Sequence, residues 1–513
     1  MTVERSPNGR NTSQKIGLVL GPLLFAATLF LNLDPSNPAV TRMAAVAVLM
    51  AAWWITDAIP LSATALLPLV LYPVLGIMKT GDCAPIYVNS TIFLFIGGFM
   101  IAVTMEKWRL HKRIALWVIR RIGGGPSRII LGFMIAAAFL SMWISNTATA
   151  IMMVPIAMAI ILQLEEQYGV EGCRPFTVAL MLGIAYACSL GGMATLVGTP
   201  PNLSFARIFE ISFPGAEPIA FGQWLVVAFP ITLVMLSIVW LLLTQLFFRF
   251  RSTFAVDPKV VRSEYAALGR MSFEERAVLA VFTATAIGWI FRKDLVLGML
   301  TIPGWSRLVP RADLIDDATV AVAMAMVLFF IPTRSAQTAS RTVMGVDVFR
   351  KIPWHIVLLF GGGFALAQGF RETGLSEFIG VRFAGLEGVP PYLMVVLTCG
   401  GLTFLTELTS NTATTEMILP ILASVAVAIK TNPLLLMIPA TLSASCAFMM
   451  PVATPPNTII FGSGRVTIAE MARVGLAINL IGVLVISLVF FFLGTAVLAI
   501  DPTVLPAWAA SAN

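Results

Sequence analysis

The sequence predicts an all-α polytopic membrane protein with about 11 transmembrane helices, two re-entrant helical hairpins and an inverted-topology repeat. Of its 513 residues, 58% are hydrophobic and 12% are charged, whereas an ordinary soluble domain is about 45–50% apolar and about 25% charged. Long uncharged stretches recur along the whole chain, and two of them share the same polar centre. The composition excludes a soluble enzyme.

The predicted crossings come from stretches long enough for the hydrocarbon core, which needs about 20 apolar residues in a helix. Short charged segments separate them. The eleven candidates are residues 16–31, 39–57, 60–77, 90–106, 176–196, 222–248, 275–291, 317–332, 353–370, 432–450 and 474–500.

Two further apolar stretches, residues 129–164 and 389–429, are interpreted as re-entrant hairpins. The first has the centre Ser-Asn-Thr-Ala-Thr at 145–149, and the second has the same letters at 410–414. Division of the first stretch at this centre leaves arms of roughly 16 residues, or about 24 Å, against a core of about 30 Å. A polar tip at membrane depth is tolerated where protein or a water-filled cavity covers it.

Charge sets the predicted orientation. With the N-terminus in the cytoplasm, 23 of the 33 Lys and Arg residues fall on the cytoplasmic side, as the positive-inside rule requires. The start of the chain is polar and resembles no cleaved signal peptide, while the tail after Asp501 lacks Lys and Arg. We therefore expect a cell (inner) membrane protein with an outside C-terminus. Basic and apolar residues alternate over 107–121, which predicts a helix lying on the cytoplasmic membrane surface.

Three five-residue motifs occur twice in the same order, which indicates an internal repeat. Five crossings separate the fourth helix from the ninth, so the two copies enter the bilayer from opposite sides. Inverted repeats of this kind are typical of secondary transporters with a site near the midplane. The pairs are 95–99 with 360–364 and 145–149 with 410–414, both at an offset of 265, and 198–202 with 453–457 at an offset of 255.

Each Ser-Asn-Thr tip precedes a helical arm, and these residue types are favoured as N-caps. The N-terminus of such an arm carries outward-pointing N–H groups and attracts anions. Two opposed tips would hold a small dianion with neutral donors, which suits a carrier because release stays easy. The alternative is that these residues only cap buried helix ends.

The Thr-Pro-Pro-Asn segments interrupt the fifth and tenth helices, because proline removes a donor and clashes one turn earlier. Exposed carbonyls with hydroxyl and Asn oxygens would form a Na⁺ cage. Ser141 and Thr406 stand one turn before each tip and could ligate a cation or bond their own i−4 carbonyls. Glu407 and Glu416 have apolar counterparts in the first copy; Glu407 is kept as a supporting candidate.

The sequence gives little support to a disulfide-bonded, metal-binding or nucleic-acid-binding protein. The five cysteines are widely spaced without a CxxC motif and there are two histidines, so neither a disulfide scaffold nor a zinc or haem site is expected. The net charge of +7 is distributed in membrane-flanking runs rather than on one face. We expect no cofactor beyond Na⁺ as the coupling ion, and no nucleic-acid partner.

The paired Ser-Asn-Thr tips, the Thr-Pro-Pro-Asn breaks and the Gly-Gly-Phe helices resemble the divalent anion/sodium symporter family, the INDY-type dicarboxylate carriers. The resemblance implies an elevator-type homodimer, with scaffold parts at 1–125 and 251–388 and transport parts at 126–250 and 389–513. It implies substrate contacts at Ser145, Asn146, Thr147, Thr199, Ser410, Asn411, Thr412 and Thr454. It implies one Na⁺ site at Ser141, Ser145, Asn146 and Gly198, and a second at Thr406, Thr409, Asn411 and Ala453.

The leading hypothesis is Na⁺-coupled import of a C4-dicarboxylate such as succinate, malate or fumarate. Citrate or sulfate symport and dicarboxylate exchange remain open within the same fold. A passive anion channel is the rival of another class, although a channel has no need of duplicated cation cages. A membrane-embedded hydrolase is more distant, because paired carboxylates and histidines are scarce.

Overall fold

The computed structural model describes residues 10–249, 259–297, 300–335 and 340–510, and these are overwhelmingly helical. The helices of the first half are α1 (Thr12–Phe30), α2 (Pro38–Thr56), α3 (Leu61–Thr64), α4 (Leu67–Leu75), α5 (Thr80–Cys83), α6 (Ser90–Lys107), α7 (Leu110–Ile122), α8 (Pro126–Ser141), α9 (Asn146–Tyr168), α10 (Val170–Met193), α11 (Pro200–Ser212) and α12 (Phe221–Leu241). A π-helical turn, η2 (Leu242–Phe247), continues α12.

The second half repeats this succession. Its helices are α13 (Lys259–Ala267), α14 (Phe273–Ile290), α15 (Asp317–Phe330), α16 (Val348–Lys351), α17 (Trp354–Glu372), α18 (Leu375–Phe383), α19 (Pro391–Thr406), α20 (Asn411–Ala428), α21 (Leu434–Ala444), α22 (Pro455–Gly462), α23 (Ile468–Val489), α24 (Thr495–Val497) and α25 (Ala507–Ala510). Shorter helical turns are η1 (Ala84–Tyr87) in the first half and η3 (Trp305–Leu308), η4 (Ala312–Leu314), η5 (Ala384–Leu386) and η6 (Phe490–Gly494) in the second.

Every predicted crossing coincides with at least one helix, and eight helical segments of the described chain are long and apolar enough to cross a membrane. The stretch 60–77 is divided into α3 and α4, where Pro68 takes an early position in α4 that needs no N–H donor. The number eleven therefore stays a prediction, while a multi-pass helical membrane protein is confirmed.

Both helical hairpins form, but the arm length of roughly 16 residues predicted for the first hairpin is wrong for its second arm, α9. The first arms, α8 and α19, have 16 residues each, whereas α9 has 23 and α20 has 18. The predicted arm ended before the charged Glu165, where the apolar residues stop. The helix continues to Tyr168 and ends at Gly169, which has a φ of 75°. The second arms are long enough to span the hydrocarbon core.

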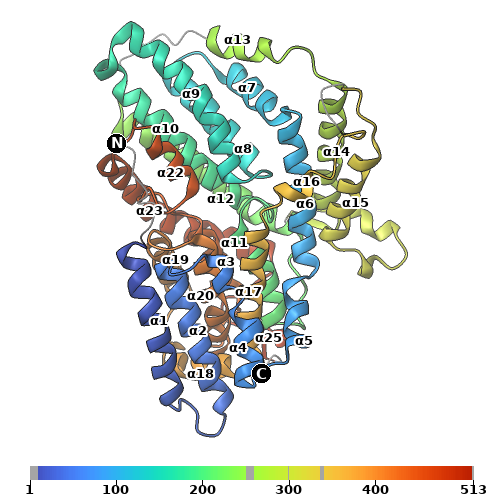
Figure 1. Ribbon diagram of the computed structural model, residues 1–513, viewed down its shortest axis with the longest axis vertical. Coiled ribbons are helices and arrows are strands. Elements are labelled where there is room, and N and C mark those ends of the chain that lie inside the picture. The colour runs from blue at the N-terminus through green and yellow to red at the C-terminus, as the bar shows by residue number, and fades with distance from the viewer. Residues whose placement is uncertain (1–9, 250–258, 298–299, 336–339, 511–513) are drawn as a thin grey trace.

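The two copies of the repeat face opposite ways. At the offset of 265, α7 corresponds to α18, and Figure 1 shows α7 and α18 near opposite ends of the long axis. The surface helix predicted over 107–121 is α7, which turns Leu116 and Ile119 inward. Arg113 of α7 forms a buried ion pair with Glu275 at 2.8 Å and donates to the carbonyls of Leu268 and Gly269, which anchors α7 beside α14.

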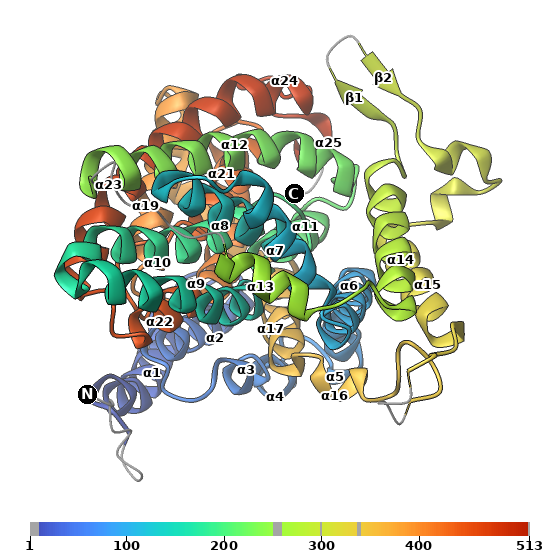
Figure 2. The same cartoon turned by 90° about the horizontal axis from the view of Figure 1, so that it is seen from above.

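The all-α prediction omitted one element. Two antiparallel strands, β1 (Leu295–Leu297) and β2 (Leu300–Ile302), pair between α14 and α15, and Figure 2 shows them projecting away from the helices. Such short strands in a continuous apolar run have no alternating pattern that distinguishes them from a helix. A buried ion pair of Arg292 with Asp317, at 2.5 Å, closes the base of this lobe.

The core centres on α10. All its residues from Phe176 to Met193 are buried, because α8, α9, α12 and α22 surround it. A helix that is apolar all round is stable only in such a position. The C-terminal end of α10 is thereby held rigidly beside the first tip, where the candidate site lies.

Candidate functional site

The first tip lies between α8 and α9. Ser145 is the N-cap of α9, and its hydroxyl accepts the Ala148 N–H at 3.2 Å, as the residue type predicts. The fully buried Ser141 hydroxyl donates to the side-chain oxygen of Asn146. Thus Ser141 fixes the orientation of the Asn146 amide instead of bonding its own i−4 carbonyl.

The second tip, between α19 and α20, repeats the Asn contact. Thr406 is fully buried and donates to the Asn411 side-chain oxygen at 2.7 Å and to the Ala444 carbonyl at 2.8 Å. Ser410 occupies the N-cap position of α20, but its side chain makes no capping bond, in contrast to Ser145. Thr409, predicted as a cation ligand, donates to the Leu405 carbonyl at 2.9 Å.

Each Thr-Pro-Pro-Asn segment starts a new helix after a break. The prolines take the first positions of α11 and α22, where a missing N–H costs nothing. The Asn202 amide donates to the carbonyls of Gly192, Met193 and Thr195, the shortest at 2.7 Å. Asn457 does the same for Ala447 and Met450 at 3.0 and 3.1 Å. The unwound segments are therefore held in place by these two amides.

All eight predicted substrate residues line one cavity of about 730 Å³. They come from the two tips and the two breaks, which lie far apart in the sequence. Of the predicted cation residues, Gly198, Thr409 and Ala453 also line this cavity, while Ser141 and Thr406 lie behind the tips and hold their Asn side chains. The structure thus brings the whole predicted set together.

Four helix N-termini converge on this cavity, where the sequence had indicated two. The first residues of α9, α11, α20 and α22 all line it. Each N-terminus carries the equivalent of about half a positive charge. No Lys or Arg occurs among the described residues that line the cavity, so the helix ends supply its positive potential and neutral side chains supply its directional hydrogen bonds.

Carbonyl oxygens crowd the first tip. A methyl group added at Gly192 would lie 2.7 Å from the Asn146 side-chain oxygen and 3.2 Å from the Gly198 carbonyl oxygen. A methyl group at Gly198 would lie 2.5 Å from the Gly192 carbonyl oxygen. These glycines let two carbonyls and an amide oxygen approach one another, which is the oxygen-rich environment that a hard cation needs.

Glu407 holds the second break. One carboxylate oxygen accepts the N–H groups of Phe448 and Met449 at 2.6 and 2.8 Å and the Asn479 amide at 2.7 Å, and the other accepts the Met450 N–H at 3.0 Å. Its counterpart in the first copy is Met142, whose carbonyl accepts the Thr195 hydroxyl at 2.5 Å. The carboxylate therefore supports the unwound segment of the second copy alone.

Glu416 lies elsewhere, on the buried face of α20. One oxygen accepts the Ser204 hydroxyl of α11 at 3.0 Å, and the other packs against Gly363 of α17. It does not line the cavity of the tips. Its contacts place it in the packing between helices rather than in the site.

Several site residues were missed by the sequence reasoning. Asn202 and Asn457 were expected to contribute at most an oxygen to a cation cage and were not named among the site residues, although their duplication was a usable signal. The side-chain oxygens of both are buried without a hydrogen-bond partner among the described residues. His355 of α17 and Asp57 after α2 also line the cavity, and no local motif marks either of them.

An inverted repeat of broken helices, with two polar tips and two unwound segments around a common cavity, defines a membrane protein of the secondary-transporter class. The chain belongs to the divalent anion/sodium symporter family: residues 23–500 match the family described as the sodium:sulfate symporter transmembrane region.

Curated relatives extend over nearly the whole chain. The protein is 41% identical over 500 residues to the sodium-dependent dicarboxylate transporter SdcS of Staphylococcus saprophyticus, covering 96% of this chain and 94% of that one. It is also 41% identical over 497 residues to SdcS of Staphylococcus aureus strain MRSA252, covering 96% and 93%. The predicted family is therefore confirmed.

Solved structures share the fold at low sequence identity. The YdaH transporter of Alcanivorax borkumensis aligns with a TM-score of 0.55 and 15% identity over 81% of this chain and 88% of its own. MtrF of Neisseria gonorrhoeae, which belongs to a class of antimetabolite efflux pumps, aligns with a TM-score of 0.51 and 12% identity over 80% and 82%. These likenesses concern the fold alone.

Proposed function

We propose that this protein imports C4-dicarboxylates such as succinate, malate and fumarate together with Na⁺. The observation that carries the proposal is the convergence of four helix N-termini and both Ser-Asn-Thr tips on one cavity without a lining Lys or Arg. A dianion with a carboxylate at each end matches two opposed, neutral, electropositive tips. The names of the relatives as sodium-dependent dicarboxylate transporters agree with this substrate class.

In this proposal the two tips bind the two ends of the dianion. The first tip contributes Ser145, Asn146 and Thr147, and the second contributes Ser410, Asn411 and Thr412. Thr199 and Thr454 of the two breaks lie beside them. One Na⁺ binds at Ser141, Ser145, Asn146 and Gly198, and a second at Thr406, Thr409, Asn411 and Ala453. The crowded oxygens around Gly192 and Gly198 support the first cation site.

We further propose an elevator motion within a homodimer. The parts 126–250 and 389–513 would move together, carrying the tips past a scaffold made of 1–125 and 251–388. Asn11, Asp57 and His355 line the cavity, and the predicted orientation places all three near the cytoplasm. The described conformation would then be open to the inside.

The test is uptake of radiolabelled succinate into proteoliposomes with an inward Na⁺ gradient, with K⁺ or Li⁺ as controls. Accumulation above the external concentration, only with Na⁺, is expected, and equilibration without accumulation would instead indicate a channel. Citrate or sulfate that abolished succinate uptake at a concentration at which malate and fumarate had no effect would contradict the substrate class.

The site assignment is tested by Asn146→Ala and Asn411→Ala. Asn146→Ala leaves the buried Ser141 hydroxyl without its acceptor, which costs about 1–3 kcal/mol, whereas in Asn411→Ala the Thr406 hydroxyl keeps the Ala444 carbonyl. Each variant also removes a proposed ligand shared by substrate and cation. We expect uptake to fall below detection in both variants at matched membrane abundance. Wild-type uptake by either variant would exclude that tip from the site.

A further inference from the structure

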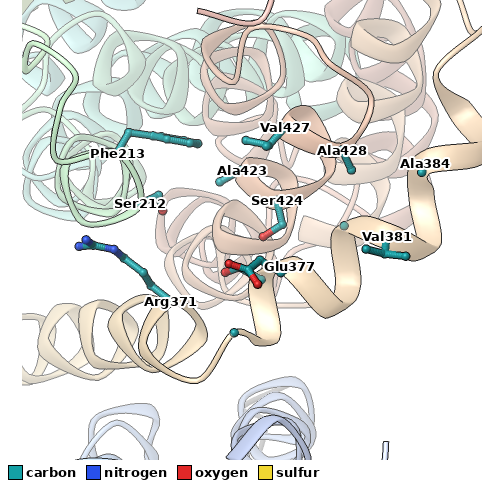
Figure 3. Close-up of a pocket in the computed structure, with 13 residues that line it drawn as sticks. Ser212, Phe213, Arg371, Glu377, Val381, Ala384, Ala423, Ser424, Val427 and Ala428 are labelled. Atoms are coloured by element: carbon teal, nitrogen blue, oxygen red, sulfur yellow. The ribbon is translucent and has the colours of Figure 1, made fainter. Parts of the chain in front are cut away.

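A second cavity lies apart from the tips, at the other end of α20. It has a volume of about 260 Å³ and shares no residue with the candidate site. Figure 3 shows its walls: Arg371 and Glu377 come from the α17–α18 segment, Ala423 and Val427 from α20, and Phe213 from the end of α11. The predicted orientation places this cavity at the outer membrane surface.

Comparison of the two repeat copies shows that this space is opened by smaller side chains. At the shared offset of 265, four lining positions of α18, the turn after it and α20 carry a smaller residue than their counterparts. The substitutions, from first to second copy, are Leu116 to Val381, Ile119 to Ala384, Met158 to Ala423 and Leu162 to Val427. Ala423 is buried, and because protein interiors are close-packed, the loss of volume there leaves space that the exposed Val381 and Ala384 do not fill.

The cavity also carries opposite charges at two places. Arg371 is exposed at its edge and donates to the Ile211 carbonyl at 3.3 Å, and Glu377 is exposed on the first turn of α18. Figure 3 shows Arg371 toward Ser212 and Glu377 toward Ser424, so the charges lie at separate points of the rim. A ligand with one negative and one positive group complements this arrangement.

The surroundings identify the rest of the ligand. Beside the rim, α18 and the turn after it expose Val381 by 74%, Phe383 by 40% and Leu386 by 37%. The predicted orientation places this segment at the membrane, where exposed apolar side chains contact lipid chains. The volume is below the range of about 300–1,000 Å³ for small-molecule sites, so it accommodates a headgroup rather than a whole amphiphile.

We propose that this cavity binds the headgroup of a phospholipid with a phosphate and a primary ammonium, as in phosphatidylethanolamine. The phosphate pairs with Arg371, the ammonium with Glu377, and the acyl chains lie along the exposed face of α18. The inference is independent of the transported substrate, because the cavity contacts neither tip.

The first test fills the cavity with the residues of the other copy, in the double variant Ala423→Met/Val427→Leu. The full-length protein is purified from membranes that contain phosphatidylethanolamine, and bound lipid is counted by native mass spectrometry. We expect retained phosphatidylethanolamine to fall by about tenfold or more, equivalent to about 1.4 kcal/mol or more. Val322→Met on the exposed face of α15 is the control and should retain the wild-type amount.

A second variant needs no change in packing. Glu377→Gln removes the partner of the ammonium, so nanodiscs of mixed composition should show loss of the wild-type preference for phosphatidylethanolamine over phosphatidylcholine. Equal retention by the filled variant and the wild type would overturn the proposal. So would a change of oligomeric state in the filled variant without a change in bound lipid, because the occupant would then be a second copy of the chain.

Discussion

Replacement of Glu407 by Gln tests how the second break is held. Glu407 accepts three backbone N–H groups, from Phe448, Met449 and Met450, and the Asn479 amide. Gln keeps the shape but has one acceptor oxygen. If that oxygen keeps the three-bond position, the Met450 N–H faces an NH₂ group and loses its acceptor.

The magnitude follows from this loss. A hydrogen bond to a charged group contributes about 1.5–3 kcal/mol, and the three remaining bonds weaken because the charge is gone. The unwound segment leads into Thr454 and the second proposed cation site. We therefore expect the Na⁺ concentration for half-maximal uptake to rise by about tenfold to about 150-fold, with a smaller change in the succinate requirement at saturating Na⁺.

The assay is Na⁺-dependent succinate uptake in proteoliposomes at matched protein abundance. Glu372→Gln is the control, because Glu372 is exposed and its partner is the Gln368 side chain at 2.8 Å. A Na⁺ dependence of Glu407→Gln equal to that of the wild type would refute the reasoning. A change confined to succinate affinity would assign the carboxylate to substrate positioning instead.

Further outcomes follow from other contacts. Ser141→Ala and Thr406→Val each free an Asn side chain at a tip, so both should raise the Na⁺ requirement for uptake more than the succinate requirement. A single cysteine at Ser263 in a Cys-free protein should react only with cytoplasmic reagents, and one at Ala510 only with external ones; labelling of both from one side would make the crossing count wrong by an odd number. In the β1–β2 lobe, the Gly304 N–H and then Arg307 lower the pKa of the Asp294 carboxyl. This support is present above the unfolded pKa and is lost as pH falls through the folded pKa. The protection of the Gly304 amide from hydrogen exchange, relative to an unstructured amide at the same pH, should therefore fall on acidification, and Asp294→Asn should show the lower protection already at neutral pH.

Much of this architecture was predictable because membrane helices occur in the sequence as uncharged runs. The duplicated motifs also show which residues of the two copies correspond. The helix starts at Asn146 and Asn411, and the breaks before Pro200 and Pro455, follow directly from cap residues and prolines. Local chemistry determines these features. The tips and breaks could therefore be assigned to one site before any distance was known.

The rest depends on contacts between distant residues. Glu407 could be kept only as a supporting candidate, because its counterpart is Met142 and its hydrogen-bond donors lie 41 to 72 positions further along the chain. The convergence of four helix N-termini instead of two required the packing of α11 and α22 against the hairpins. The end of α9 was misjudged because charge marks the edge of the hydrocarbon, whereas Gly169 marks the end of the helix.

The two copies support their tips by different chemistry, and this difference makes the proposed cation sites unequal. The first copy uses neutral groups only: Ser141 on Asn146, and Thr195 on the Met142 carbonyl. The second copy places the carboxylate of Glu407 at the cavity wall. Since four helix N-termini make the cavity positive for the proposed dianion, a cation at a tip gains most beside Glu407, because the other lining carboxylate, Asp57, follows α2 and belongs to neither tip. The second site should therefore fill first, and its cation then offsets Glu407, so that the dianion meets an electropositive cavity at both ends.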